Sequence, residues 1–188
     1  MMLKRLLKEY EYYLKVTKGL STNTISSYKT DLIEYVDFLE RNYRIKDPSI
    51  VTKQHIRNFI ARLKRKHSTK ASISRKLSAV RSFHKYLMIE KIVITNVALG
   101  ISLPKKDKRL PTVLNVDEVD ALMVAADGDE PLEVRNKAML ELLYGSGLRI
   151  SELLDLRLRD LHLNMGFLNI TGKGNKERIV PIGAEGAY

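Results

Sequence analysis

The 188-residue sequence contains no cysteine. This absence excludes a disulfide framework and any zinc site built from cysteine thiolates, and it is typical of proteins from a reducing cytoplasm. Long hydrophobic runs are also lacking, because no apolar stretch approaches the ~20 residues that a membrane-spanning helix needs. The N-terminal stretch MMLKRLLKEYEYYLK carries too many charges for a signal peptide, and Glu9 and Glu11 disfavour a basic amphipathic membrane helix. We therefore expect a cytoplasmic protein without a membrane partner.

Acidic residues are scarce in the first 110 residues and common afterwards. Residues 1–110 contain 25 Lys and Arg against 9 Asp and Glu, an excess of +16, whereas residues 111–188 contain 8 against 13, a deficit of −5. The whole chain has a net charge of +11. A strongly basic segment is the electrostatic footprint of a nucleic-acid-binding surface, although a solubilising surface without a partner has the same composition.

Hydrophobic spacing predicts four amphipathic helices in residues 1–101. Apolar residues recur three and four positions apart in each helix, and polar breaks separate the helices. Ser21 or Thr22 is expected to cap the second helix, and Thr52 is expected to cap the third. The fourth helix is expected over residues 71–90. Four short-looped amphipathic helices predict a compact four-helix bundle.

The fourth predicted helix has two contrasting sides. Projected at 100° per residue, its apolar residues gather on one side together with His84, which we interpret as a packed core histidine. The opposite side carries Arg75, Ser78, Arg81, Ser82 and Lys85. Cations and hydroxyls bind phosphates and base edges, and a solvated face usually mixes both signs of charge. The acid-free pattern therefore favours a DNA contact.

Residues 102–111, SLPKKDKRLP, read as a basic linker between two domains, because two prolines bracket a charged run. Its lysines, Lys105 and Lys106 among them, are expected to lie along a phosphate backbone. The linker separates a predicted DNA-binding domain, residues 1–101, from a second predicted domain, residues 112–188.

The second predicted domain is of the α+β class. Asn115, with a glutamate three residues on, predicts a capped helix, a further helix is expected over residues 132–144, and Ser151 is expected to cap a short one. From about residue 161, short apolar runs separated by turn residues predict a small antiparallel sheet. The predicted fold is therefore mainly α, a four-helix bundle followed by the first part of an α+β domain.

Two glycine-containing stretches present cations. GSGLRISELLDL, residues 145–156, places Arg149 between a turn and a capped helix, and NITGKGNKERIVPIG places Lys173 at a hairpin tip with Lys176 and Arg178 on the return strand. Flanking glycines let the backbone approach another molecule. Neither stretch has the glycine spacing of a dinucleotide or Walker A loop. Taken singly, Arg149 reads as a surface or salt-bridged arginine, and the hairpin reads equally as a phosphate contact or a plain turn.

Taken together and in this order, GLRISEL and GKGNKERIVPIG resemble the tyrosine recombinase (integrase) superfamily, and its Xer branch most closely. Four further segments are also similar to Xer sequences, namely STNTISSYKTDL, LSAVRSFHKYL, LPTVL and NKAMLELLYGSGLRISELL. The resemblance therefore covers nearly the whole chain. It implies a SAM-like core-binding domain and a catalytic domain that together clamp duplex DNA. Family members cut and rejoin two duplexes through a Holliday junction without a metal or other cofactor. Xer members act in pairs of related subunits, as a tetramer on two duplexes, to resolve chromosome dimers.

The resemblance implies that Arg149 is the first catalytic arginine and Lys173 the catalytic lysine. A fixed guanidinium stabilises charge on the non-bridging phosphate oxygens, and a lysine at the leaving 5′ oxygen either donates a proton or shields charge. The family's His-x-x-Arg motif is absent, because none of the four histidines has an arginine three residues on, and Tyr188 is expected to lie in a helix rather than to be the nucleophile. We therefore expect a chain truncated within its catalytic domain, which binds DNA without cutting it.

The predicted function is site-specific recombination through a 3′-phosphotyrosyl intermediate, with duplex DNA and a like or paralogous recombinase subunit as partners. Two alternatives remain open, a non-catalytic DNA-binding protein that kept the clamp, and a basic helical module for a protein or RNA. The presence of both Arg149 and Lys173 disfavours the second alternative. The predicted DNA contacts are Thr22, Asn23, Ser26, Arg75, Ser78, Arg81, Ser82, Lys85, Lys105, Lys106, Lys176 and Arg178.

Overall fold

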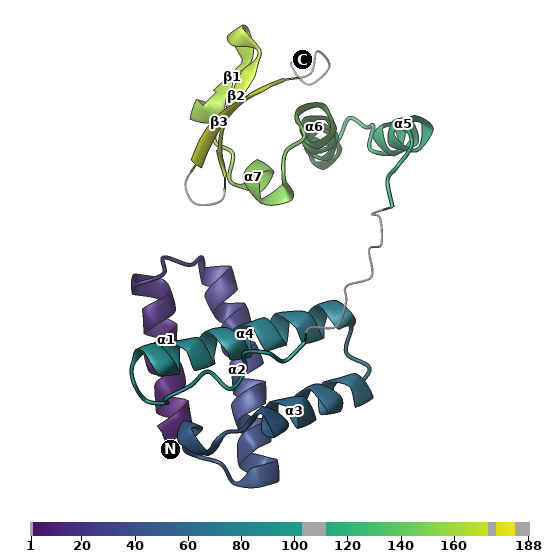
Figure 1. Cartoon of the computed structure of the whole chain (residues 1–188). Helices are drawn as coiled ribbons and strands as arrows, with labels where there is room; N and C mark the ends of the chain where they lie inside the picture. Colours follow the sequence, from purple (N-terminus) through teal and green to yellow (C-terminus); the bar gives the residue numbers. More distant parts are fainter. Residues whose placement is uncertain (1, 103–111, 173–175, 183–188) are drawn as a thin grey trace. The chain divides into compact units, whose positions relative to one another are not determined.

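The computed structural model describes residues 2–102, 112–172 and 176–182 (Figure 1). The chain divides into two compact units, an N-terminal unit, Met1–Arg109, and a C-terminal unit, Leu110–Tyr188. The N-terminal unit is helical, and the C-terminal unit combines helices with a small sheet. The predicted mainly α fold with a small antiparallel sheet is confirmed. Within the described ranges, no helix has the length and apolarity needed to cross a membrane.

Four long helices build the described part of the N-terminal unit. They are α1 (Met2–Val16), α2 (Thr22–Tyr43), α3 (Lys53–Arg65) and α4 (Lys70–Ile89). The side chain of Ser21 caps α2 and that of Thr52 caps α3, since each accepts a hydrogen bond from a backbone N–H of the first turn. A short 3₁₀ helix, Pro48–Ile50, connects α2 to α3. Figure 1 shows α4 running across α1 and α2, with α3 on the same side of the bundle.

The core of the N-terminal unit surrounds α4 on more sides than the sequence predicts. The expected apolar side is buried, and His84 is buried with it, with only 1% of its surface exposed. However, Ser74, Ala79, Phe83 and Tyr86 are buried as well, although they lie outside the predicted stripe. α1 and α2 supply much of the remaining core, and residues 92–101 close it through Ala98 and Ile101. α4 is therefore a central helix and not a surface one.

The C-terminal unit contains three helices and three strands among its described residues. The helices are α5 (Val116–Ala125), α6 (Pro131–Ser146) and α7 (Ile150–Leu154), followed by a 3₁₀ turn, Leu158–Asp160. The strands are β1 (Leu161–His162), β2 (Phe167–Gly172) and β3 (Lys176–Pro181), and a 3₁₀ turn, Leu163–Met165, joins the first two. The strands form an antiparallel sheet in the order β1-β2-β3.

Strand register assigns side chains to the two faces of this sheet. Leu168 faces Val180, and Ile170 faces Arg178, across the β2–β3 ladder. Successive residues of a strand point to opposite faces, so these four positions share one face. Leu168, Ile170 and Val180 are buried there and form a small core with residues that include Leu153 of α7. Arg178 therefore emerges from the packed face of the sheet.

Two local predictions in the C-terminal unit are wrong. The residue that caps α7 is Arg149, not Ser151, because Arg149 has the extended backbone of an N-cap and Ser151 lies inside the helix. The helix expected to end at residue 144 continues through Gly145 to Ser146, and its C-cap is Gly147, which adopts the left-handed conformation (φ +59°) that glycine favours. The capping box predicted at Asn115 and Glu118 is confirmed.

Candidate nucleic-acid interface and active site

The first turn of α2 and one side of α4 share a surface. Thr22, Asn23 and Ser26 are exposed on α2. From α4, the guanidinium of Arg75 reaches back to α2, where it donates a hydrogen bond to the carbonyl of Ser27 at 3.4 Å. The structure therefore places Arg75 beside Ser27, the residue that follows the predicted contact Ser26.

A buried carboxylate beneath this surface holds its cations. The side chain of Asp31 is fully buried, and its Oδ2 lies 2.5 Å from Nη1 of Arg75 while its Oδ1 lies 3.2 Å from Nζ of Lys76. Lys76 also binds Glu34 at 2.6 Å. A buried charge needs partners of opposite sign, which explains why Asp31 sits between two cations. Arg75 nevertheless keeps 47% of its side chain exposed, so part of its guanidinium faces outward.

Three of the five residues predicted on the polar side of α4 have partners within the N-terminal unit. Ser82 accepts a hydrogen bond from the hydroxyl of Tyr10 at 2.7 Å, and Ser78 donates one to the carbonyl of Ser74 at 2.9 Å. The guanidinium of Arg81 donates to the carbonyl of Ile101. These three residues are half-buried, and of the five only Arg75 and Lys85 are exposed. The open polar side expected for α4 is therefore narrower than the helical projection indicates.

α3 presents cations that the sequence analysis did not single out. Residues 48–89 contain eleven Lys and Arg and no Asp or Glu. This absence of acidic residues was the sequence signal from which the cations of α3 could have been predicted. Lys53, Arg57 and Lys64 recur at helical spacing along the exposed side of α3. Arg57 and Lys64 also line a groove of about 330 Å³ together with residues 100–102. The basic surface of the N-terminal unit thus includes α3 as well as α4.

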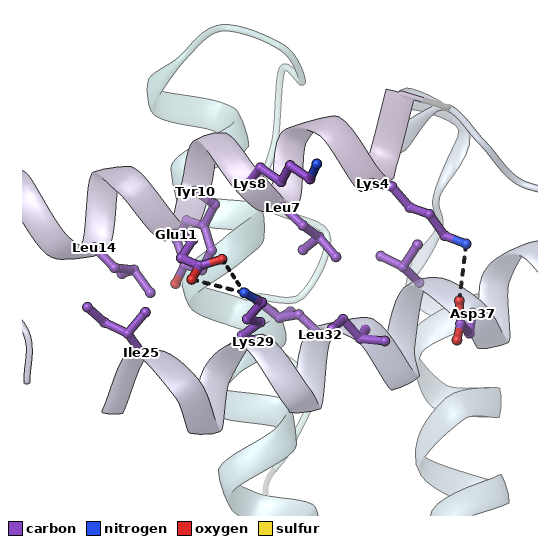
Figure 2. A pocket seen from close by; sticks show the side chains of 12 residues that line it. Lys4, Leu7, Lys8, Tyr10, Glu11, Leu14, Ile25, Lys29, Leu32 and Asp37 are labelled. Atoms are coloured by element: carbon purple, nitrogen blue, oxygen red, sulfur yellow. Dashed lines mark hydrogen bonds and ion pairs between the residues drawn. The ribbon is translucent and has the colours of Figure 1, made fainter. Parts of the chain in front are cut away.

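A second groove, of about 320 Å³, lies between α1 and α2 and has a different character. Figure 2 shows apolar side chains such as Leu7, Leu14 and Ile25 along it. Two of the three lysines that line it are paired, since Lys4 lies 3.5 Å from Asp37 and Lys29 lies 2.9 Å from Glu11. A predominantly apolar groove in which most of the cations are paired is poorly suited to bind phosphates.

In the C-terminal unit, Arg149 is anchored by one carboxylate. Its backbone N–H donates to Oε2 of Glu152 at 2.9 Å, and its Nη1 donates to Oε1 of the same side chain at 2.8 Å. The first bond caps α7 and fixes the residue that carries the guanidinium. The Glu152 side chain is 4% exposed, whereas that of Arg149 is 72% exposed. The backbone of Arg149 is therefore fixed, while most of the N–H donors of its guanidinium face solvent.

Arg178 binds the same carboxylate from β3. Its Nη1 lies 2.7 Å from Oε1 of Glu152, and its Nη2 lies 2.9 Å from Oε2. These hydrogen bonds from Arg178 above all, together with those from Arg149, hold the pKa of Glu152 well below its usual range. Arg178 was predicted to be a DNA contact, and Glu152 was not among the predicted site residues. The position of Glu152 in the first turn of α7 was the only local signal for its role. Its contact with Arg178 spans 26 residues and forms only when the sheet is folded.

Three predicted site residues lie outside the described residues, namely Lys173, Lys105 and Lys106. Lys176, the first residue of β3, is exposed. In the part of the chain that the structure describes, no cluster of three His, Asp or Glu side chains has a metal-binding arrangement. The candidate active site is thus defined by Arg149, Glu152 and Arg178.

Comparisons with known proteins agree with the two units. A family model for the phage integrase N-terminal SAM-like domain matches residues 7–91, and a model for the phage integrase family matches residues 112–188. Tyrosine recombinase XerD from Halalkalibacterium halodurans is 44% identical over 177 residues, which are 94% of this chain and 59% of that protein. XerD from Oceanobacillus iheyensis is 44% identical over 182 residues, 97% of this chain and 61% of that protein.

The chain therefore spans less than two thirds of the length of these relatives. Among solved structures, a lambda integrase dimer bound to a COC′ core site has a TM-score of 0.76 at 19% identity, and the match covers 96% of this chain and 62% of that one. This likeness shows a shared fold. The two family models and the XerD relatives agree, and the chain belongs to the phage integrase family of tyrosine recombinases.

Proposed function

We propose that this chain is the DNA-binding and phosphate-binding part of a site-specific tyrosine recombinase of the Xer type. The observation that carries the proposal is the Arg149 site, an exposed guanidinium fixed on a buried carboxylate, in a chain 44% identical to XerD proteins. The substrate is duplex DNA. The partners are further recombinase subunits, of this chain or a paralogue, in a tetramer on two duplexes.

The chemistry assigned to Arg149 follows from its free donors. Attack on a phosphodiester places developing charge on the non-bridging oxygens, and a fixed guanidinium that can bind two of them stabilises that state. In the proposed reaction a tyrosine hydroxyl attacks phosphorus, a 3′-phosphotyrosyl bond forms, and the 5′ oxygen leaves with a proton. Lys173 is proposed to act at that 5′ oxygen. The sequence of 188 residues includes neither a His-x-x-Arg motif nor a tyrosine assigned as nucleophile.

The N-terminal unit is proposed to hold the duplex. The contact surface consists of Thr22, Asn23 and Ser26 on α2 and of Arg75 and Lys85 on α4. The exposed cations of α3 add phosphate contacts. The internal bond from Arg81 to the Ile101 carbonyl argues for a structural role of that arginine and against the DNA contact predicted for it. The linker cations, Lys105 among them, are proposed to follow the backbone of the DNA.

The test is the salt dependence of DNA binding by residues 1–188, measured by fluorescence anisotropy with a duplex of about three helical turns. Each phosphate contact contributes a slope of about −0.9 on a log–log plot of affinity against salt. Lys85→Gln is expected to reduce the slope by about one contact, whereas Arg135→Gln, which removes an exposed charge from α6, is expected to leave it unchanged. Affinity that does not change with salt would contradict the proposal.

Cleavage provides a second test. A duplex nicked near the scissile phosphate traps a covalent protein–DNA adduct, which a denaturing gel detects. Residues 1–188 alone are expected to bind this duplex and to form no adduct, because charge stabilisation without an aimed nucleophile leaves the phosphodiester intact. An adduct would show that one of the nine tyrosines already present is the nucleophile.

A further inference from the structure

The carboxylate of Glu152 is saturated with hydrogen bonds. Oε1 accepts one from Nη1 of Arg149 at 2.8 Å and one from Nη1 of Arg178 at 2.7 Å. Oε2 accepts one from the backbone N–H of Arg149 and one from Nη2 of Arg178, both at 2.9 Å. An ionised carboxylate offers about four lone-pair sites, so no site remains for a further donor.

The two guanidinium groups share these four sites unequally, two for Arg178 and one for Arg149, whose backbone N–H takes the fourth. Arg178 takes one full edge with two parallel N–H donors, which is the bidentate geometry that guanidinium and carboxylate prefer. The side chain of Arg149 obtains one bond only, and its remaining N–H groups are not used on Glu152. The exposed fractions agree, because the Arg149 side chain is 72% exposed and that of Arg178 is 38% exposed.

We propose that Arg178 is a positioning residue that keeps the Arg149 guanidinium turned outward, by occupying the edge of Glu152 that Arg149 would otherwise bind in a bidentate pair. The proposal deepens the function proposed above and rests on it for the role of Arg149 at phosphate. It also replaces the direct DNA contact predicted for Arg178. Charge leads to the same result, because two arginines on one carboxylate leave a net charge of +1, whereas Arg149 alone on Glu152 would be neutralised.

The backbone of the hairpin is built around this pair. A Cβ at Gly172, the last residue of β2, would lie 3.3 Å from Nη1 of Arg178 and 3.3 Å from Oε1 of Glu152. Such contacts are tighter than ordinary van der Waals distance, so any larger residue would push the pair apart. Gly172 was expected to let the strand approach another molecule. In the structure its missing side chain leaves room for the Glu152–Arg178 bond.

The alternation of side chains along β3 explains why Arg178, and not an adjacent residue, binds Glu152. Arg178 shares the packed face of the sheet with Ile170 and Val180, and this face looks toward α7, which carries Glu152. Glu177 and Ile179 alternate to the other face. The bond from Arg178 therefore ties β3 to Glu152 in the first turn of α7, and through Glu152 to Arg149.

The experiment uses residues 1–188 and four variants. Arg178→Gln removes the bidentate partner and one charge, and Arg178→Lys keeps the charge but loses the fork geometry. Gly172→Ala retains every charged group and only crowds the pair. Arg157→Gln is the matched control, because it removes one positive charge from an exposed arginine in the same unit. Backbone amide spectra of each variant establish that the C-terminal unit remains folded.

The first readout is the guanidinium of Arg149, observed in ¹⁵N spectra. In Arg178→Gln, a bidentate Arg149–Glu152 pair is expected to slow rotation about the Cζ–Nε bond of Arg149, and Gly172→Ala is expected to shift the same signals in the same direction. Arg178→Lys is expected to give an intermediate result, and Arg157→Gln none. Unchanged Arg149 signals in folded Arg178→Gln and Gly172→Ala proteins would overturn the proposal.

The second readout is a double-mutant cycle on DNA affinity, measured with the same duplex. Arg149→Gln is expected to weaken binding by about fivefold in the native background but by less than about twofold in the Arg178→Gln background, because Arg149 is already withdrawn there. Equal losses in both backgrounds would contradict the positioning role. If Arg149→Gln has no effect in either background while the ¹⁵N signals move as expected, the positioning of Arg149 stands and its proposed role at phosphate fails.

Discussion

The two units of this chain differ in how they are held together. The N-terminal unit completely buries several large aromatic side chains, among them Tyr10, Tyr35, Phe59 and Phe83. Among its described residues, the C-terminal unit has six buried hydrophobic residues, three of them on the sheet, and none of them lies in α6. Since buried apolar area is the dominant favourable term in folding, the N-terminal unit is expected to be the more stable one.

The polar contacts of the two units show a parallel difference. In the N-terminal unit the buried carboxylate of Asp31 lies under a surface whose shape a large core already fixes. In the C-terminal unit Glu152 joins α7 to β3 where few apolar contacts do so. The difference teaches that Arg149, the arginine proposed to bind phosphate, depends on a polar network for its position, whereas the helices proposed to contact DNA depend on packing.

The largest expected effect separates the stabilities of the two units. Phe83→Ala removes a fully buried ring that contacts Tyr10 at a centroid distance of 5.3 Å, and it is expected to destabilise the N-terminal unit by about 3–5 kcal/mol. Leu158→Ala, at a position 87% exposed in the C-terminal unit, is expected to change stability by less than about 0.5 kcal/mol. Urea titrations followed by amide spectra report each unit separately.

If the two units unfold independently, Phe83→Ala is expected to shift the urea unfolding transition of residues 2–102 and to leave that of residues 112–182 unchanged. If the signals of both units move together, the chain unfolds as one cooperative structure and the comparison between two separate cores fails.

Packing also decides which parts of the fold the sequence could predict. Periodicity predicted four helices in the N-terminal unit and placed the fourth to within one residue at each end, because each helix buries a stripe with a period of 3.6 residues. The same projection misjudged α4, since Phe83 and Tyr86 are buried against α1 and residues 92–101 cover Arg81. A helical projection describes one helix and contains no information about how many neighbours surround it.

The candidate site shows a similar limit. Arg149 could be selected from GLRISEL because its motif is local, and the structure places it at the start of α7. Glu152 and Arg178 could not be joined from the sequence, because their contact depends on the register that sets Arg178 opposite Ile170. The cap of α7 was misassigned to Ser151 for a related reason, since serine is the commoner cap and Arg149 caps through its backbone and the Glu152 carboxylate.

The second prediction contrasts the pH ranges in which the units lose stability. Burial lowers the pKa of His84 to about 4, and the only hydrogen bond described for its ring joins Nε2 to the Tyr35 hydroxyl at 3.0 Å. The unfolded chain, with a histidine pKa near 6.5, binds the proton more readily than the folded chain. The stabilisation is therefore complete above pH 6.5 and is lost as the pH falls toward 4, by about 3 kcal/mol in all.

The pKa of Glu152 is lowered as well, but from the lower starting value of a carboxylate, so its contribution is lost in a more acidic range. Its contribution to the C-terminal unit is present above the pKa of an unfolded glutamate and is lost only at more acidic pH. Urea titrations between pH 7 and pH 4.5 are expected to show a loss of stability confined to the N-terminal unit, and His84→Gln is expected to reduce that loss. An equal loss in native protein and His84→Gln would assign it to other groups.

The smallest expected effect concerns helix caps, and it compares one helix from each unit. Thr52 caps α3 and Asn115 caps α5, and both helices have a capping box. Removing either side chain costs about 1 kcal/mol of local helix stability. The consequences differ, because α3 buries Ile56, Phe59 and Leu63, whereas the buried residue of α5 is Val119 alone. Packing holds the first turn of α3 after its cap is lost, but little holds that of α5.

Asn115→Ala is therefore expected to lower the hydrogen-exchange protection of α5 amides by about fivefold along the helix, and Thr52→Ala to affect only the first turn of α3. Similar, local losses in both helices would show that α5 is held as firmly as α3, and that the C-terminal unit is more tightly packed than its few buried residues indicate.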